Sequence, residues 1–329
     1  MIKGLLGKRA LWIAAALLMT GLIYWGRHDL AKIGTLSPLP LVLCFICTAG
    51  IALSAALKWK VSIQSMGETQ ATHLGSLLHY FMIGRVLGLV VPMDVGDLAA
   101  RTASLKMDHS MPIGRATYSV YLDRAFDVAV AGILFVPSVL FIVGAVSARV
   151  GIMVYGLAFL GGLVCFAFFG RRTTDFLVAL FRLLFRLACK IPGLRNRVDV
   201  EAEQALVTAT SSTSVARTLY LLSGVKFLCT AMRFASIALA MRLAAGVTEM
   251  LLFAPGAQVA AIISFTPGGM GIVDWSWSGL LYKIGVDKHD IVPYLVSLRL
   301  ATWISVLVLA GFSRLVYRKP PRQTAGAGS

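Results

Sequence analysis

Long apolar runs dominate the pattern of hydrophobic and polar positions along the chain. Because an α-helix rises about 1.5 Å per residue, about 20 apolar residues cross the roughly 30 Å hydrocarbon core of a bilayer. Six runs come close to that length: Leu11–Gly26, Leu39–Leu57, Ala125–Val146, Gly151–Gly170, Leu219–Ala245 and Ile291–Phe312. The pattern therefore predicts an all-α, polytopic membrane protein with about six full spans.

Two shorter apolar stretches, Leu74–Val91 and Leu251–Leu281, do not fit continuous spans, because proline and glycine interrupt them. Non-helical backbone is tolerated at membrane depth only where it is buried in protein or lines a wet cavity. Each stretch is therefore predicted to form a re-entrant hairpin, which enters the bilayer and returns on the same side. The predicted turn residues are Pro92, Gly96, Pro267, Gly268, Gly269 and Gly271.

The distribution of Lys and Arg predicts the orientation. Residues 1–10, residues 171–217 and the segment after Phe312 are rich in basic residues, and the intervening loops are poorer. Basic loops remain in the cytoplasm, so we expect both termini in the cytoplasm of a bacterial inner (plasma) membrane. Residues 61–112 then begin and end in the cytoplasm, and residues 246–290 begin and end outside.

An internal repeat relates the two hairpins. A shift of 175 residues places Pro267, Gly271 and Arg299 on Pro92, Gly96 and Arg124, and residues 219–233 on residues 44–58. The orientation gives the two copies opposite topology in the membrane. The chain is therefore predicted to contain two inverted-topology repeats, which are typical of transporters with a site near the membrane midplane.

These signals divide the chain into five parts. They are an N-terminal transmembrane helix (1–35), the first repeat with its hairpin (36–147), a connecting span and basic segment (148–217), the second repeat (218–319) and a disordered tail (320–329). In the connector, Arg182, Arg186 and Lys190 alternate with apolar residues at helical spacing. This pattern favours a basic amphipathic helix on the anionic lipids of the cytoplasmic leaflet, with a solvated connector as the alternative.

Composition narrows the class of protein further. Hydrophobic residues make up 58% of the chain and charged residues 14%, against about 25% charged in soluble domains. A net charge of +16 would suggest nucleic acid on a soluble protein. Here the basic residues gather in connecting segments, as membrane orientation requires, so no nucleic-acid partner is expected.

No motif for catalysis or metal binding stands out. Cys44 and Cys47 have C-x-x-C spacing, but they lie within a predicted span and have no second pair or neighbouring histidines. The five histidines lack metal-ligand spacing, and neither a nucleophile elbow nor a phosphate-binding loop is present. The sequence therefore predicts no catalytic residue, no metal, no cofactor and no enzyme activity.

Charges at membrane depth are the strongest candidates for function, since each costs about 2.5–3.5 kcal/mol at a helix centre on insertion scales. Arginine binds phosphate bidentately and stays charged. The candidates for binding a lipid phosphate are Arg85, Arg101, Arg124 and Arg299. The candidates for ion pairing or proton coupling are Asp97, Asp123, Asp127 and Asp274. A purely structural role, in which the acids and arginines pair and fix the hairpins, is the alternative, and both roles can coexist.

The glycine-rich second turn predicts close backbone approach, because glycine permits positive φ. We expect this turn near the midplane, against the Pro92–Gly96 turn. Asp274 should face the same interior, with Arg299, Lys226 or Arg233 as its partner. The turn could also present backbone N–H groups to an anion.

Taken together, these residues resemble the lysylphosphatidylglycerol synthase transmembrane-region family, whose members are also described as flippase-like. The likeness covers essentially the whole chain. It rests on Gly84-Arg85, Pro92-Met93-Asp94-Val95-Gly96-Asp97 with Arg101, Asp123-Arg124, Pro267-Gly268-Gly269-Met270-Gly271 with Asp274, and Arg299. Asp97 and Asp274 depart from the family pattern, which usually has Glu, and so shorten the carboxylate's reach by one methylene.

The resemblance implies a lipid flippase or transporter that moves an anionic or phosphate-linked amphiphile, such as a phospholipid, a hopanoid or an isoprenoid-linked lipid. Full-length synthases add an aminoacyltransferase domain, which is not expected after Arg314. The alternatives are a non-transporting accessory subunit that binds a lipid- or glycolipid-modifying enzyme and, less favoured, a membrane-embedded transferase. The sequence does not indicate the oligomeric state.

Overall fold

The computed structural model describes residues 37–68, 73–189, 212–262, 264, 266 and 268–317, together with Thr20 and Tyr24. Of residues 182 and 184–189 it describes only the backbone. Nearly all of the predicted first span, the connector from residue 190 to residue 211, Pro267 and the tail 320–329 therefore lie outside the described residues.

Five of the described helices are long and apolar enough to cross a bilayer. They are α2 (Pro38–Gln64), α5 (Ile113–Ile142), α6 (Ala148–Cys189), α8 (Thr213–Ala240) and α11 (Lys288–Val316). They include the predicted spans from the second to the sixth. The described part of the chain contains no β-strand, which confirms the prediction of an all-α, polytopic membrane protein.

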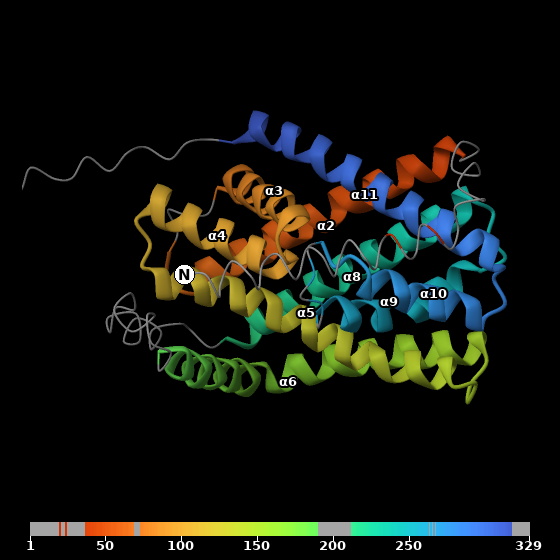
Figure 1. Cartoon of the computed structure of the whole chain (residues 1–329). Coiled ribbons are helices and arrows are strands. Elements are labelled where there is room, and N and C mark those ends of the chain that lie inside the picture. Colours follow the sequence, from red (N-terminus) through yellow and green to blue (C-terminus); the bar gives the residue numbers. More distant parts are fainter. Residues whose placement is uncertain are drawn as a thin grey trace, which may run out of the picture.

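Four shorter helices form two hairpins. The first consists of α3 (Leu74–Val90) and α4 (Met93–His109), and the second of α9 (Val247–Ile262) and α10 (Ile272–Lys283). Pro92 precedes α4 with extended backbone (φ −50°, ψ 129°), because a proline is disfavoured inside a helix and well placed at its start. Figure 1 shows the first hairpin in one half of the bundle's length and the second hairpin in the other half.

The connecting span is longer than predicted. The sequence separated a span over Gly151–Gly170 from a basic amphipathic helix, but α6 runs without a break from Ala148 to Cys189. No proline falls within this range, so nothing in the backbone chemistry interrupts the helix. Figure 1 shows α6 along one side of the bundle.

The helix boundaries follow the 175-residue repeat. The shift carries Pro38, the start of α2, onto Thr213, where α8 begins, and Ile113, the start of α5, onto Lys288, where α11 begins. It also carries α3 and α4 onto α9 and α10 to within a few residues. The two four-helix groups, α2 to α5 and α8 to α11, therefore share one order of elements.

The contacts between helices also follow the repeat. Helix α3 packs on α11, and its counterpart α9 packs on α5. Likewise α2 packs on α11 and α8 packs on α5, while α2 and α8, which are each other's counterparts, pack together extensively. Exchanging the two groups leaves this set of contacts unchanged, as expected for two halves related by a pseudo-twofold axis.

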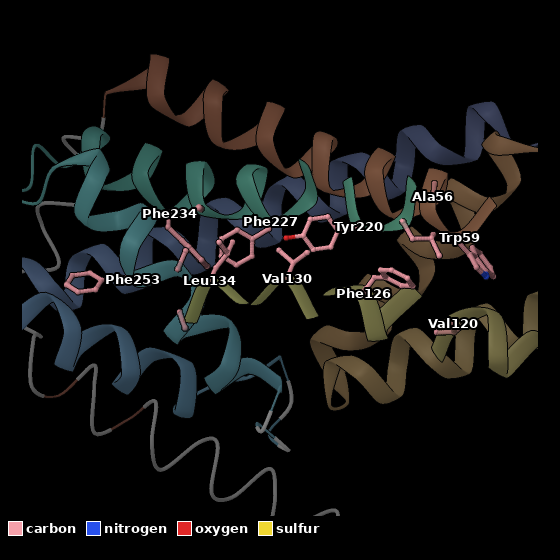
Figure 2. Packing of buried hydrophobic residues seen from close by; sticks show 14 of the residues in the cluster. Ala56, Trp59, Val120, Phe126, Val130, Leu134, Tyr220, Phe227, Phe234 and Phe253 are labelled. Atoms are coloured by element: carbon pink, nitrogen blue, oxygen red, sulfur yellow. The ribbon is translucent and has the colours of Figure 1, made fainter. Parts of the chain in front are cut away.

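Aromatic and branched side chains fill the interior between the halves. Tyr220 and Phe227 of α8 lie near Val130 and Leu134 of α5 (Figure 2). The Tyr220 ring stacks on Phe166 of α6, with ring centroids 4.7 Å apart. Aromatic contacts of this kind bury large apolar areas, and here they fix α5, α6 and α8 as a packed unit beside the hairpins.

Large apolar side chains also cover the outside of the bundle. On α6, Leu157 is 68% exposed and Phe168 79% exposed. Water would oppose such exposure, but the acyl chains of a bilayer do not. The exterior of α6 is therefore suited to contact lipid, consistent with an integral membrane protein.

Candidate functional site

The tips of the two hairpins meet. The backbone N–H of Gly268 donates to the carbonyl oxygen of Gly88, at 3.1 Å, and Gly88 lies near the end of α3. Gly268, Gly269 and Gly271 all have positive φ, between 58° and 86°, which glycine adopts without steric cost. The second turn thus lies against the end of the first hairpin, close to the predicted Pro92–Gly96 turn.

Arg299 and Asp274 hold the second turn in place. The Asp274 carboxylate accepts from Nε and Nη2 of Arg299, at 2.9 and 2.8 Å, and from the backbone N–H of Gly271, at 2.9 Å. Of the three partners that the sequence offers to Asp274, the structure selects Arg299. The same guanidinium donates to the carbonyl oxygens of Gly268 and Gly269, at 2.6 and 3.1 Å.

This geometry shows where the backbone groups of the turn go. The sequence suggested that its N–H groups could face an anion, and the N–H of Gly271 does donate to a carboxylate, that of Asp274. The N–H of Gly268 donates instead to the carbonyl oxygen of Gly88, and the Gly268 and Gly269 carbonyls accept from the Arg299 cation. Protein groups on both sides of the Asp274–Arg299 pair therefore satisfy these backbone groups of the turn.

Around α4 and α5, eight charged side chains form one continuous series, here called the charge chain. Neighbours along it are ion-paired, and acid and base alternate strictly. Its members are, in order, Lys226, Asp127, Lys58, Asp123, Arg101, Asp97, Arg124 and Asp94. Four cations meet four carboxylates, so the charge chain is neutral as a whole.

The middle of the charge chain is fully buried. Lys58 Nζ lies 2.9 Å from Oδ1 of Asp123, and Arg101 Nη1 lies 2.8 Å from Oδ2 of the same carboxylate, with none of the three side chains exposed. The Arg101 guanidinium also lies over the Trp59 ring, 4.2 Å from its centroid. Buried pairs of this kind fix geometry more than they add stability.

The two ends of the charge chain reach a cavity of about 440 Å³. Its wall takes residues from both halves and includes Arg85, Asp94, Arg124, Asp127, Lys226, Arg233, Asp274 and Arg299, together with apolar side chains such as Phe227, Trp277 and Trp303. The cavity between the helices is thus lined by both charged and apolar side chains.

Each carboxylate of this wall has a basic partner. Asp94 pairs with Arg124 at 3.0 Å, Asp127 with Lys226 at 2.5 Å and also with Lys58, and Asp274 with Arg299 at 2.8 Å. These pairs neutralise three of the wall's five cations. The remaining two, Arg85 and Arg233, have no carboxylate partner among the described residues.

The predicted site residues divide between the wall and the packed interior. Arg85, Arg124, Arg299, Asp127 and Asp274 line the cavity, as do Gly268 and Gly269. Arg101, Asp97 and Asp123 are fully buried in the middle of the charge chain and do not line it, so Arg101 is placed as a structural cation. Pro92 lies in the first turn, as predicted, whereas Gly96 lies inside α4 and not in the turn, where its missing side chain lets α4 approach α3 closely.

The sequence named Asp94 only in the family motif, and Lys226 and Arg233 only as possible partners of Asp274, so none of the three was assigned to the site. All three line the cavity. A usable signal existed for Arg233, which lies 175 residues after Lys58 and so occupies its place in the second repeat. No group of side chains suited to a metal ion occurs within the described residues.

Comparison with known sequences adds one finding. The model of a protein family described as "Lysylphosphatidylglycerol synthase TM region" matches residues 11–310. This range includes eight of the nine helices named above in full, most of the ninth, α11, and every residue of the cavity wall. A search of curated proteins found no match.

Proposed function

The chain belongs to the lysylphosphatidylglycerol synthase TM region family, and we propose on this premise that it moves an anionic or phosphate-linked lipid between the leaflets of its membrane. The family and the apolar helices support a lipid-related role for an integral membrane protein. The lipid's headgroup passes through the cavity while its hydrocarbon tails remain in the bilayer.

One observation carries this proposal: two cations of the cavity wall, Arg85 and Arg233, have no carboxylate to pair with among the described residues, although every carboxylate of the wall is paired. An uncompensated cation in an apolar enclosure is costly. An anionic headgroup that enters the cavity relieves this cost, and the arginines in turn replace the water that the headgroup loses.

The arrangement of the helices supports alternating access. Each half contributes one hairpin, the hairpin tips touch, and the contacts between helices are preserved when the halves are exchanged. Inverted repeats with broken helices move against each other around a fixed site in many transporters. Of the four acids proposed for ion pairing or proton coupling, only Asp127 and Asp274 line the cavity, so only these two are placed to couple directly to a headgroup inside it.

The accessory-subunit alternative is less well supported. Such a subunit needs an outer binding surface and a packed interior, whereas this chain has a charged cavity of about 440 Å³ between its halves. We therefore propose a transporter that is not an enzyme. Its proposed partners are the lipid that it carries and the anionic lipids of the cytoplasmic leaflet.

Transport can be tested with the purified protein in liposomes that contain a fluorescent anionic phospholipid. The fraction of lipid that a membrane-impermeant quencher reaches reports its movement between leaflets. Replacing both free cations, Arg85→Gln with Arg233→Gln, should slow the movement at least about tenfold, since each charge-assisted contact contributes about 1.5–3 kcal/mol. Arg115→Gln is the matched control, because Arg115 pairs with Glu68 away from the cavity.

If the double variant folds and moves lipid as fast as the wild type, the cavity is not the route. A normal melting temperature of the variant in detergent establishes folding. Vesicles with the control variant should behave like those with the wild-type protein.

The proposed orientation has its own test. Single cysteines placed at Lys106, in α4, and at Lys288, at the start of α11, should react with impermeant maleimide from opposite sides of the inner membrane. The first lies in the cytoplasm and the second outside if both termini are cytoplasmic. Labelling of both from the same side would rule out the inverted-repeat topology.

A further inference from the structure

We propose that the cavity binds a phosphate headgroup with two negative charges, a phosphomonoester or a diphosphate, between Arg85 and Arg233. The proposal rests on the transport function for the statement that the ligand is a lipid. The number of negative charges on the ligand is inferred from the charges of the cavity wall. The charge chain is neutral, the Arg299 and Asp274 pair is neutral, and the two free arginines leave the enclosure with two positive charges.

Arg233 is the better-defined half of the site. Its residue is only 8% exposed, and its Nε and Nη1 are buried without any hydrogen-bond acceptor. The guanidinium lies over the Phe234 ring, 5.4 Å from its centroid, and the residue lines the cavity. Buried guanidinium groups are normally hydrogen-bonded, so these two donors are available to an acceptor on a ligand in the cavity.

The internal repeat explains why Arg233 is unpaired. Its counterpart in the first half is Lys58, which is paired with Asp123 and Asp127. The positions equivalent to these two acids, 175 residues later, hold Leu298 and Thr302. The second half thus keeps the cation and lacks both carboxylates that would neutralise it.

Arg85 supplies the second charge from the other half of the molecule. Its Nη1 lies 2.8 Å from the thioether sulfur of Met93, a weak acceptor. The guanidinium is also 5.9 Å from the centroid of the Phe81 ring. Arg85 and Arg233 line the same cavity of about 440 Å³, so an anion inside it can meet both cations.

The number of charges distinguishes among lipid headgroups. A phosphodiester such as that of phosphatidylglycerol has one negative charge and leaves one cation uncompensated. A phosphomonoester or a diphosphate has two or more negative charges and at least three terminal oxygens, and so offers acceptors to both planar forks. A zwitterionic headgroup adds a cation to an enclosure that already has an excess of them.

Binding to the purified full-length protein in detergent tests this proposal without requiring transport. The probes are three short-chain lipids: dihexanoyl phosphatidic acid, dihexanoyl phosphatidylglycerol and dihexanoyl phosphatidylcholine. At pH 8 we expect calorimetry to show phosphatidic acid binding at least about tenfold more tightly than phosphatidylglycerol, the effect of one additional charge-assisted contact. Phosphatidylcholine should bind most weakly. Equal affinity for the two anionic lipids at pH 8 would overturn the proposal.

The preference should depend on pH through the ligand. The second proton of a phosphomonoester dissociates near pH 6, so the preference should shrink toward unity at pH 5. The other charged groups of the described wall are Asp94, Asp127, Asp274, Lys226, Arg124 and Arg299, and no histidine is among them. Titration of these groups would also change the binding of phosphatidylglycerol, which therefore serves as the internal control. A preference unchanged between pH 5 and pH 8 counts against a dianion site.

Two kinds of variant separate charge matching from folding. Arg233→Gln should remove most of the preference for phosphatidic acid and change the affinity for phosphatidylglycerol less. Thr302→Asp leaves Arg233 in place and restores the acid that its counterpart Lys58 has in Asp127, so it should remove the preference as well. Leu298→Asp repeats this test at the position equivalent to Asp123. If Thr302→Asp and Leu298→Asp both fold and both keep the wild-type preference, Arg233 is not part of the anion site.

Two further experiments test whether the bound phosphate belongs to a lipid and whether the dianion site stands independently of transport. Inorganic pyrophosphate should compete only weakly, because it lacks tails to occupy the lipid side; competition as strong as that of the lipid would overturn the lipid assignment. Selective binding of phosphatidic acid without lipid movement in vesicles would support the dianion site and contradict transport. Movement of phosphatidylcholine as fast as phosphatidic acid would support transport and contradict the dianion site.

Discussion

The first hairpin, α3 with α4, is tightly closed, and the second, α9 with α10, is open. Val91 and Pro92 alone connect α3 to α4, whereas residues 263–271 connect α9 to α10. A Cβ on Gly96 would lie only 2.8 Å from the backbone nitrogen of Gly88, so the first pair of helices is in backbone contact. On the second hairpin, Gly279 of α10 has open space beside it, because a Cβ there would meet nothing within 4 Å.

The charges differ in the same direction. Lys58 and Arg101 in the first half are enclosed with the carboxylates that neutralise them, while Arg233, the counterpart of Lys58, borders the cavity without one. One repeat unit has thus been used in two ways. The first half supplies all members of the neutral charge chain except Lys226, and the second half contributes the glycine-rich turn and the free cation Arg233 to the cavity.

The largest effect should come from breaking the charge chain. Lys58→Met leaves Asp123 and Asp127 with one cation fewer inside the bundle, and removing one partner of a buried ion pair costs about 3–5 kcal/mol. The matched variant Arg233→Met removes a cation that has no carboxylate, so it relieves an uncompensated charge and should leave the free energy of unfolding unchanged or raise it.

Reversible unfolding in mixed detergent and SDS micelles measures both values. The comparison between the halves fails if the two variants destabilise the protein equally, because Lys58 and Arg233 would then have equivalent surroundings.

A smaller loss is expected from Asp274→Asn in the second half. The variant removes the carboxylate charge from Arg299, but the guanidinium keeps the Gly268 and Gly269 carbonyls as acceptors, and the Asn oxygen can still accept one hydrogen bond. We expect a loss of roughly 2–3 kcal/mol, below that of Lys58→Met. Increased cysteine labelling at Ser264, beside the turn, would report its loosening. A loss larger than that of Lys58→Met would mean that the second turn, and not the charge chain, is the main electrostatic anchor.

The sequence predicted the five spans that the structure describes, the two helix hairpins and the 175-residue register of the helices, because these depend on local hydropathy, helix breakers and spacing. It did not predict which acid meets which base. Asp97 had both Arg101 and Arg124 within reach along the chain and pairs with both, since the rotation of α4 against α5 decides the contacts. Arg233 was left out of the site for a different reason. It stands out only because it lacks the two acids that pair with its counterpart Lys58, and this difference becomes visible only when the two halves are compared position by position.

The next prediction concerns the backbone contact of the first hairpin. Gly96→Ala adds a methyl group 2.8 Å from the nitrogen of Gly88 and 3.0 Å from the carbonyl carbon of Leu87. Backbone cannot give way as a flexible side chain does, so α3 and α4 must separate, at a cost of about 1–3 kcal/mol. Unfolding in SDS and the rate of proteolysis between the hairpins measure the effect. An unchanged free energy of unfolding would show that α3 and α4 can separate without cost, and the two hairpins would then not differ in how closely their helices pack.

The smallest effect is expected at Gly279, on the open side of the comparison. This glycine lies inside α10, is exposed, and has nothing within 4 Å of the position that a Cβ would occupy. Alanine fits there without displacement and reduces the backbone freedom of the unfolded chain, so Gly279→Ala should stabilise the protein by about 0.5–1 kcal/mol. The same unfolding assay measures it beside Gly96→Ala, with the same chemical change giving opposite signs in the two hairpins. A destabilising Gly279→Ala would place another part of the protein or a second copy against that face of α10, and the second hairpin would then be as closely packed as the first.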